Sequence, residues 1–296
     1  MSENKISELI TSDHIKSFQD DGFMIIEKFW PESLILDFEK MIISFYYQTA
    51  LKISKLKKHF HDSTDPTSFQ SIEDLDEVLR LLETEDKEAA YQTLSLIENS
   101  VASKNIQTHG KFLEICSLLL NCPNQLFSFS GPHPFTNIPT SKRLLYRWHS
   151  ESNFYPKRRN FLNIWFPLFR NKSSENGTMY FCKGSHKNQN LNFVEYQGYD
   201  EDTHGKKNHF MQLEIPESEL SNYERIAVNA NRKDLVIFNK NLVHTSTLNT
   251  SQDITYASVM RVLDTRNDLT FSGNMGIKPY QGNNDGRSGM EPILRL

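Results

Sequence analysis

Three residues of the kinds that bind transition metals follow two separate strand-like runs of this sequence. His149 and Glu151 come directly after the run 144–148, and His244 follows the run 234–238, 95 positions after His149. Two imidazoles and one carboxylate can occupy one face of a metal ion and leave the other face open, an arrangement that favours non-haem Fe(II). The pattern therefore predicts a fold in which two strand ends, far apart in the chain, lie side by side.

The spacing of His149 and Glu151 suits a shared role as metal ligands. Alternate side chains of an extended strand point to the same face, so Arg147, His149 and Glu151 share a face if the extended geometry continues. The alternative is a surface histidine beside a solvated glutamate, because an H-x-E triplet is a weak signal in a chain with ten histidines. His244, after a second strand, makes the metal site the stronger interpretation.

The sequence after Pro123 predicts a β-rich core. Turn clusters rich in Asn, Gly, Ser and Lys separate short strands there without intervening helices, a pattern that favours an antiparallel sandwich or barrel. The expected strands are 126–130, 143–149, 161–168, 178–182, 209–214, 224–229, 234–238 and 254–263.

The region 50–120 differs from the rest of the chain. Glycine is almost absent there, and apolar residues such as Leu75, Leu79 and Leu82 recur at helical spacings. We expect three or four helices in a region at about 50–121, which is either inserted into the β core or packed against it. Because such cores leave specificity to their additions, this helical region is our candidate for a cap over the substrate.

The N-terminal part predicts a helix, a strand and a second helix. The first helix is capped at 12–13 and is expected to end near Asp20. The stretch 23–29 is expected to form a strand, and the second helix to run from Pro31 to about Thr49.

Length, charge and cysteine usage exclude several classes of protein. The 296 residues suit one domain, and a net charge of −4 gives no electrostatic footprint for nucleic acid. No apolar run approaches the roughly 18 residues that cross a bilayer, and no secretion signal opens the chain. Cys116, Cys122 and Cys182 are odd in number and widely spaced, which favours a reducing compartment. We expect a single cytoplasmic domain over 1–296 that acts on a small-molecule substrate, without nucleic-acid or membrane partners; the oligomeric state is left open.

An ordered series of motifs resembles the phytanoyl-CoA dioxygenase family of Fe(II)/2-oxoglutarate-dependent oxygenases. The resemblance covers roughly 10–45 and 140–263 and leaves the helical stretch between them unexplained. The segments that carry it are Phe18–Phe23 (FQDDGF), Trp148–Pro156 (WHSESNFYP), Leu162–Leu168 (LNIWFPL), Glu175–Met179 (ENGTM), Lys183–Lys187 (KGSHK), Lys233–Phe238 (KDLVIF) and Leu242–Asn249 (LVHTSTLN).

The resemblance implies a double-stranded β-helix, that is, a cupin-like jelly roll, to which we expect this chain to add an N-terminal helical portion and an α-helical insertion. It implies that His149, Glu151 and His244 bind Fe(II), with 2-oxoglutarate as cosubstrate and O2 as oxidant. Ser246 matches a position that often contacts the cosubstrate carboxylate, and Trp165 matches an aromatic that lines the cosubstrate pocket, although a plain core role suits Trp165 equally well. The family usually has aspartate where Glu151 stands; because a carboxylate is retained, oxygenation is favoured over halogenation.

One position departs from the family pattern. The family usually carries an arginine about eleven residues after the second histidine, and this chain has Thr255 there. A cation is still needed, because the distal carboxylate of 2-oxoglutarate is buried and requires a charge-assisted partner. Arg261 has the parity of Thr255, but six strand residues displace it by about 20 Å. Arg147 is the rival, and a third outcome is that neither serves; we favour Arg261.

The sequence thus predicts an Fe(II)/2-oxoglutarate-dependent dioxygenase that hydroxylates a small-molecule metabolite and converts 2-oxoglutarate to succinate. The alternative is a jelly-roll protein that binds metal or sugar without redox chemistry, or a family relative that has lost 2-oxoglutarate binding. The missing arginine is the support for that alternative.

Overall fold

The structure is a computed structural model that describes residues 10–53, 71–141, 145–154, 160–196 and 212–266. The described helices are α2 (Ser12–Asp20), α3 (Glu32–Lys52), α4 (Ile72–Glu85), α5 (Lys87–Glu98), α6 (Val101–Gln107) and α7 (Gly110–Leu120). The described strands are β1 (Phe23–Ile26), β2 (Phe127–Asn137), β3 (Asn160–Leu168), β4 (Met179–Cys182), β5 (Val194–Tyr196), β6 (Gln212–Glu214), β7 (Arg225–Ala227), β8 (Leu235–Asn239), β9 (His244–Ser246) and β10 (Thr255–Asp264).

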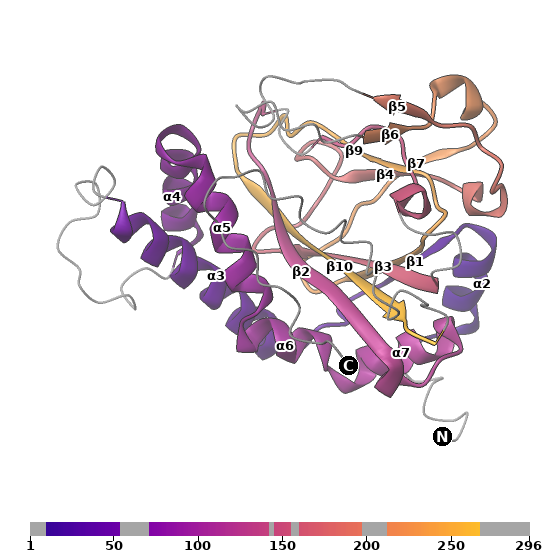
Figure 1. The fold of residues 1–296 in the computed structure, drawn as a ribbon, viewed down its shortest axis with the longest axis horizontal. Coiled ribbons are helices and arrows are strands. Elements are labelled where there is room, and N and C mark those ends of the chain that lie inside the picture. Colours follow the sequence, from indigo (N-terminus) through magenta and orange to yellow (C-terminus); the bar gives the residue numbers. More distant parts are fainter. Residues whose placement is uncertain (1–9, 54–70, 142–144, 155–159, 197–211, 267–296) are drawn as a thin grey trace, which may run out of the picture.

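Two antiparallel sheets form the β core. The larger sheet has the order β1-β8-β3-β10-β2, and the smaller sheet has the order β7-β4-β9. Strands β5 and β6 pair separately as a third, two-stranded unit. Figure 1 shows the larger sheet between the smaller sheet on one side and helices α3 to α7 on the other.

Strand β3 separates the hydrophobic core from a cavity. Ile164 and Phe166 belong to the main hydrophobic cluster, which also contains the buried residues of α3 to α7. Asn163 and Trp165 alternate with them and line a cavity on the opposite face of the sheet. Because both faces of β3 are buried, its sequence is a nearly continuous apolar run.

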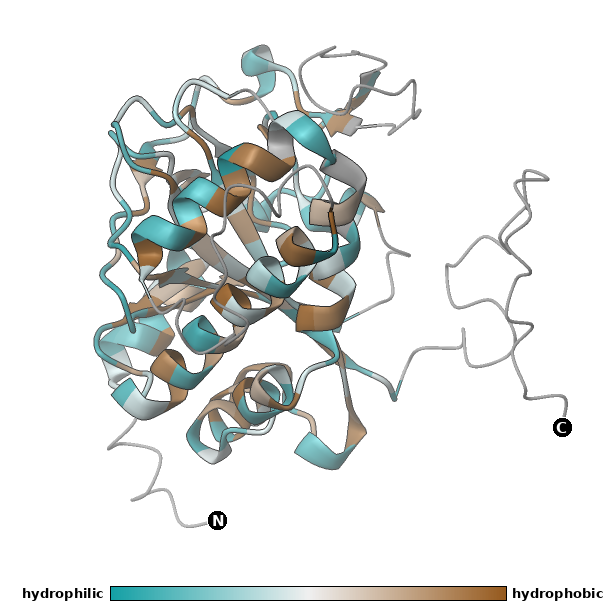
Figure 2. Ribbon diagram, turned by 90° about the vertical axis from the view of Figure 1, so that its left-hand side faces the viewer, coloured by the Kyte–Doolittle hydropathy of each residue, from teal (hydrophilic) through white to brown (hydrophobic). Residues whose placement is uncertain are grey.

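The helices cover the outer face of the larger sheet. Helices α5 and α6 contact β2, and α7 contacts β3. Each helix carries both hydrophobic and hydrophilic residues along its length (Figure 2), as expected for helices with one buried face. None of the described helices is long and apolar enough to cross a lipid bilayer.

Buried charged groups fasten the helices to the sheet. Glu39 on α3 accepts hydrogen bonds from Arg232 Nε at 2.9 Å and from the backbone N–H of Phe169 at 2.6 Å. Asp76 on α4 accepts a hydrogen bond from the Tyr256 hydroxyl on β10 and is 3.0 Å from Arg170 Nη1. Glu39 is buried and Asp76 is partly buried, and a carboxylate removed from water needs its partners, so these bonds hold the helical layer in one position on the sheet.

Most of the predicted elements are confirmed. The region 71–120 contains four helices and no strand, in agreement with the helical prediction, while 54–70 lies outside the described residues. The N-terminal helix, strand and helix are present, although the first helix is capped by Thr11 rather than by 12–13. Strands β5 and β9 were not predicted, and β2 extends to Asn137, seven residues beyond the predicted end.

The predicted strand 143–149 is wrong where it can be compared. Residues 145–148 have no regular structure, and His149 forms an isolated bridge with His244; residues 142–144 lie outside the described part of the chain. The ladder is interrupted because the N–H of Tyr146 donates to the Ser246 hydroxyl, at 2.6 Å, instead of to a backbone carbonyl. The predicted strand 209–214 is present as β6 from residue 212 onward.

Candidate metal centre

His149, Glu151 and His244 meet at one point between the two sheets. Each residue offers a ligand atom, and these atoms all lie within 4.8 Å of one another. His149 Nε2 is 3.7 Å from Glu151 Oε1, and the centroids of the two imidazole rings are 4.2 Å apart. The structure therefore brings together the three residues that the sequence predicts as metal ligands.

Backbone pairing positions the two histidines. The N–H of His149 donates to the carbonyl of His244 at 2.9 Å, and the N–H of His244 donates to the carbonyl of His149 at the same distance. Each ring uses Nδ1 on a nearby carbonyl: His149 on that of Arg147 at 2.6 Å, and His244 on that of Leu242 at 2.9 Å. Because a carbonyl only accepts, Nδ1 carries the proton in both rings and Nε2 remains available to a metal.

Glu151 reaches the site from a turn rather than from a strand. It is the first residue of a 3-10 helix, Glu151–Phe154, so the extended geometry does not continue to it as the sequence suggests. Arg261 on β10 holds one carboxylate oxygen, with Nε at 3.0 Å and Nη2 at 2.6 Å from Oε2. The other oxygen, Oε1, faces His149. Arg261 thus fixes the orientation of the carboxylate that completes the triad.

The electrostatics of the site favour the ligand forms of these groups. Burial alone would raise the pKa of Glu151, but the charge of Arg261 and the hydrogen bond with His149 outweigh it and hold this pKa well below its usual range. Burial, together with the proximity of His149, lowers the pKa of His244 to about 3. A deprotonated carboxylate and a neutral imidazole are the forms that bind metal, so His244 and Glu151 are ready to ligate at neutral pH.

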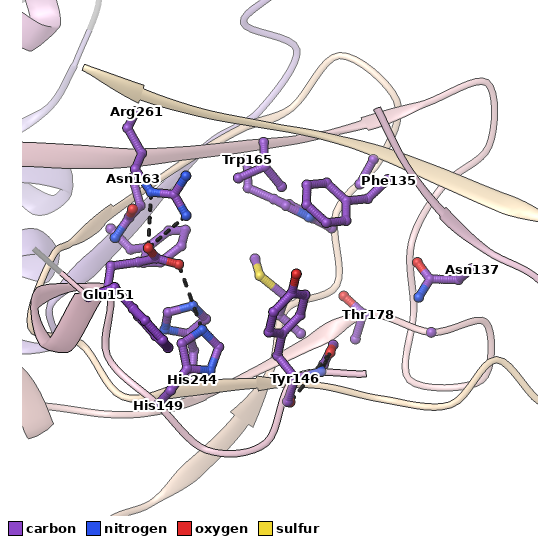
Figure 3. A pocket seen from close by; sticks show the side chains of 17 residues that line it. Phe135, Asn137, Tyr146, His149, Glu151, Asn163, Trp165, Thr178, His244 and Arg261 are labelled. Carbon is purple, nitrogen blue, oxygen red and sulfur yellow. Dashed lines mark hydrogen bonds and ion pairs between the residues drawn. The ribbon is translucent and has the colours of Figure 1, made fainter. Parts of the chain in front are cut away.

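The triad lies in a cavity of about 480 Å³ between the two sheets. Figure 3 shows Arg261, Asn163 and Glu151 together at one end of it, above the two histidines, and Asn137 and Thr178 at the other end. A volume of this size is typical of sites that enclose small organic molecules.

Two of the predicted cosubstrate residues line this cavity as expected. Trp165 reaches it from β3 and Ser246 from β9. The Ser246 hydroxyl also accepts the hydrogen bond from the Tyr146 N–H, so its orientation is fixed.

The two candidate arginines do not lie beside Thr255. Arg147 does not line the cavity; its side chain is 47% exposed and is ion-paired with Glu214 at 2.8 Å. Arg261 lines the cavity, but it lies opposite Asn163 in the sheet and contacts the metal end, whereas Thr255 lies opposite Asn137. The parity of Arg261 along the strand correctly predicts that it faces inward, but its position along β10 places it beside Glu151 of the triad.

Two polar residues of the site were not found from the sequence. Asn163 is buried and lines the cavity, and neither its amide nitrogen nor its amide oxygen has a hydrogen-bond partner among the described residues. An asparagine inside the apolar run of β3 was a usable signal, because a buried amide needs a partner. Lys172 is only 2% exposed and donates to Thr255 Oγ1 at 2.7 Å. A lysine in a polar turn after a strand predicts a solvated side chain, so no local pattern indicated its burial.

The helical region does not cover the cavity. No described residue between 71 and 120 lines it, because α4 to α7 pack on the opposite face of the larger sheet (Figure 1). The expectation that this region caps the substrate is therefore wrong for its described part.

A family model and several solved structures match the chain. Residues 18–255 match the model described as Phytanoyl-CoA dioxygenase (PhyH). No curated protein sequence matches at a significant level.

Solved structures of low sequence identity share the fold. EvdO2 from Micromonospora carbonacea var. aurantiaca, complexed with 2-oxoglutarate, has a TM-score of 0.52 and 15% identity, over 86% of this chain and 91% of its own. SnoK, a non-heme alpha-ketoglutarate-dependent carbocyclase from nogalamycin biosynthesis, has a TM-score of 0.52 and 15% identity, over 88% and 86%. EctD from S. alaskensis with bound Fe has a TM-score of 0.53 and 13% identity, over 87% and 78%.

Proposed function

Because the chain belongs to the phytanoyl-CoA dioxygenase family, we propose that it is an Fe(II)/2-oxoglutarate-dependent dioxygenase that hydroxylates a small-molecule metabolite. The observation that carries the proposal is the convergence of His149, Glu151 and His244 within one buried site. We further propose that the two antiparallel sheets are the halves of a double-stranded β-helix, and that residues 1–296 form one domain around it.

The donor set fits iron. Two imidazole nitrogens and one carboxylate oxygen occupy one face of an ion, which is the ligand set of non-haem Fe(II) oxygenases. When iron, 2-oxoglutarate and O2 are bound, they supply oxidative chemistry at a C–H bond with conversion of 2-oxoglutarate to succinate and CO2. His149, Glu151 and His244 would hold the ion, and Arg261 would keep the carboxylate of Glu151 oriented toward it.

The cavity supplies what the protein itself contributes to such a reaction. The aromatic side chains of Phe135, Trp165 and Phe238 line it and exclude water from the reacting groups. The amide of Asn163, which lies close to the triad and has no hydrogen-bond partner among the described residues, is available to orient a ligand through a hydrogen bond (Figure 3). Hydroxylation is the reaction we propose; SnoK, a protein of similar fold, is a carbocyclase, so the fold alone does not decide the reaction type.

Succinate formation is the direct test of the proposed function. We expect the protein, loaded with Fe(II) and supplied with 2-oxoglutarate and air, to release succinate slowly even without its primary substrate. Protein loaded with Zn(II) should release none, because zinc has no redox chemistry. Failure of the iron-loaded protein both to bind 2-oxoglutarate and to form succinate would favour the metal-binding alternative.

Arg261 is expected to act on the metal centre rather than on the cosubstrate. Loss of a group that orients a metal-ligating residue lowers metal affinity by about 10- to 100-fold, so Arg261→Leu should weaken Fe(II) binding by that factor. At saturating iron, its affinity for 2-oxoglutarate should remain close to that of the wild type. Metal titration and ligand titration measure the two quantities separately.

Arg147→Leu is the matched control, since Arg147 lies outside the cavity, and it should change neither affinity. If Arg261→Leu keeps its iron affinity but binds 2-oxoglutarate much more weakly, Arg261 binds the cosubstrate, as the sequence predicts, and does not act on the metal centre.

A further inference from the structure

Lys172 is a buried lysine that has no counter-charge among the residues that the structure describes. Its Nζ donates to Asn137 Oδ1 at 2.6 Å, to Thr255 Oγ1 at 2.7 Å and to the carbonyl of Gly177 at 3.0 Å. All three acceptors are neutral, and no carboxylate of the described residues pairs with it. Burial lowers the pKa of Lys172 to about 7. Burying an ammonium without an anion is strongly unfavourable, so a ligand that brings an anion to this position would stabilise the charged form.

Lys172 does not itself line the cavity, but its ammonium lies behind the end that is remote from the triad. Two of its three partners, Asn137 and Gly177, line the cavity, and so do the three residues of the triad. Figure 3 places Asn137 at the opposite end from Glu151. The smaller sheet connects the two ends of the cavity over a few residues. Met179 on β4 pairs with Ser246, which follows the ligand His244 by two residues, and Gly177 precedes Met179 by two residues.

We propose that the ammonium of Lys172, held by Thr255 and Asn137, binds the distal carboxylate of 2-oxoglutarate and so replaces the arginine that the chain lacks at position 255. This inference rests on the proposed function. A short threonine leaves room that a long arginine would fill, and the lysine enters that room from the segment after β3 instead of from β10. The positive charge at the start of β10 is therefore supplied by the segment after β3, and not by β10 itself.

The hydrogen bonds around Lys172 show how it accepts an anion. Thr255 Oγ1 donates to the carbonyl of Asn176 at 2.6 Å, so toward Lys172 it is an acceptor that orients the ammonium. All three N–H groups are in use, and the amide of Asn137 is the side-chain acceptor that faces the cavity. Rotation of this amide would free one N–H and turn the amide nitrogen toward the incoming carboxylate, which then receives two donors.

Gly177 allows this arrangement. Its φ is +83°, and a Cβ there would lie 3.1 Å from Cβ and Cγ of Asn137. Only glycine accommodates both the left-handed backbone and this close approach. The turn that contains Gly177 can therefore lie against Asn137 and bring the Gly177 carbonyl to within 3.0 Å of the ammonium.

The binding of two ligands to metal-loaded protein tests the proposal. Ni(II) serves as a redox-inert substitute for iron, and calorimetry measures the affinities for 2-oxoglutarate and for 2-oxobutyrate, a 2-oxo acid that lacks the distal carboxylate. In Lys172→Met, we expect 2-oxoglutarate binding to weaken by about 10- to 100-fold, the range for a lost charged hydrogen bond. The affinity for 2-oxobutyrate should not change. Lys172→Arg keeps the charge and should keep a preference for 2-oxoglutarate.

Lys240→Met is the control, because Lys240 is a half-buried lysine that lies outside the cavity lining. It should change neither affinity. Equal weakening of both ligands in Lys172→Met would mean that Lys172 only supports the fold, and would overturn the proposal. If wild-type protein with bound Ni(II) takes up neither 2-oxo acid, the proposed function fails and this inference with it.

The pH dependence of wild-type binding is a second measurement that needs no variant to fold. The groups that face Nζ are Asn137 from β2, Thr255 from β10 and the carbonyl of Gly177, and none of them titrates. Because the anion binds the ammonium form, the dissociation constant for 2-oxoglutarate should rise above pH 7 toward tenfold per pH unit, and that for 2-oxobutyrate should not. Parallel pH profiles for the two ligands would contradict the proposal.

Discussion

His149→Ala and His244→Ala are each expected to lose stoichiometric Fe(II) and to lower the rate of succinate formation at least about a thousandfold, about 4 kcal/mol of transition-state stabilisation. The reason is geometric. The two rings are held by backbone pairing with Nδ1 protonated on a carbonyl, so each contributes one fixed Nε2, and nothing else among the described residues replaces it. Iron content by elemental analysis and succinate release measure the two losses independently.

His14→Ala is the matched control, because His14 lies on α2, where its ring contacts Thr11, and belongs to no group of potential metal ligands in the described part of the chain. It should retain one iron per chain and full succinate formation. Full iron content in either of the two site variants would show that the metal does not bind at this triad.

The sequence predicted the elements whose pattern is local. The strand predicted at 161–168 is β3, which begins one residue earlier, and Leu75, Leu79 and Leu82, whose spacing predicts a helix, lie on α4. The segment before His149 failed because its pairing depends on a distant residue: the hydroxyl of Ser246 takes the N–H of Tyr146 and interrupts the ladder. No pattern within 143–149 contains that information.

The helical region illustrates the limit of amphipathic patterns. The spacing of Leu75, Leu79 and Leu82 predicts that one helix face is buried, and these residues are buried. It does not predict which surface covers that face. The structure places the helices on the outer face of the larger sheet, so the substrate-cap hypothesis failed although the helix prediction held.

In the candidate site, too, one part could be predicted from the sequence and another could not. The metal triad was recoverable because residue type and spacing pointed to it, although the strand predicted before His149 is absent over the described residues 145–148. The cation was not, because Lys172 and Thr255 are 83 residues apart and meet only through the tertiary fold. For Arg261, parity along a strand correctly gave the face, but the position along the cavity depends on how the two sheets are placed, and that is not encoded in a period of two.

The buried ammonium also predicts how stability responds to pH. The pKa of Lys172 is about 7 in the folded protein, against 10.5 for an ordinary lysine. Between these values the unfolded chain binds more protons than the folded one, so this residue makes the free energy of unfolding rise as pH increases, by up to about 1.4 kcal/mol per pH unit. Below pH 7 both states are protonated, and the unfavourable burial of the charge is fully present.

We therefore expect the unfolding free energy of the wild type, minus that of Lys172→Met, to increase by about 3–5 kcal/mol between pH 7 and pH 10. Denaturant titration at several pH values measures it, and the subtraction removes all groups that titrate alike in both proteins. A difference that does not depend on pH would show that Lys172 is not a strained cation.

The pH dependence of the free energy of unfolding also tests whether 2-oxoglutarate contacts Lys172. When 2-oxoglutarate occupies the Ni(II)-loaded site at saturation, its distal carboxylate should return the pKa of Lys172 toward the ordinary value, because an opposite charge favours the ammonium form. The extra rise in stability above pH 7 should then disappear, while 2-oxobutyrate, which has no distal carboxylate, should leave it in place. A slope that 2-oxoglutarate does not alter would mean that the carboxylate and the ammonium do not meet.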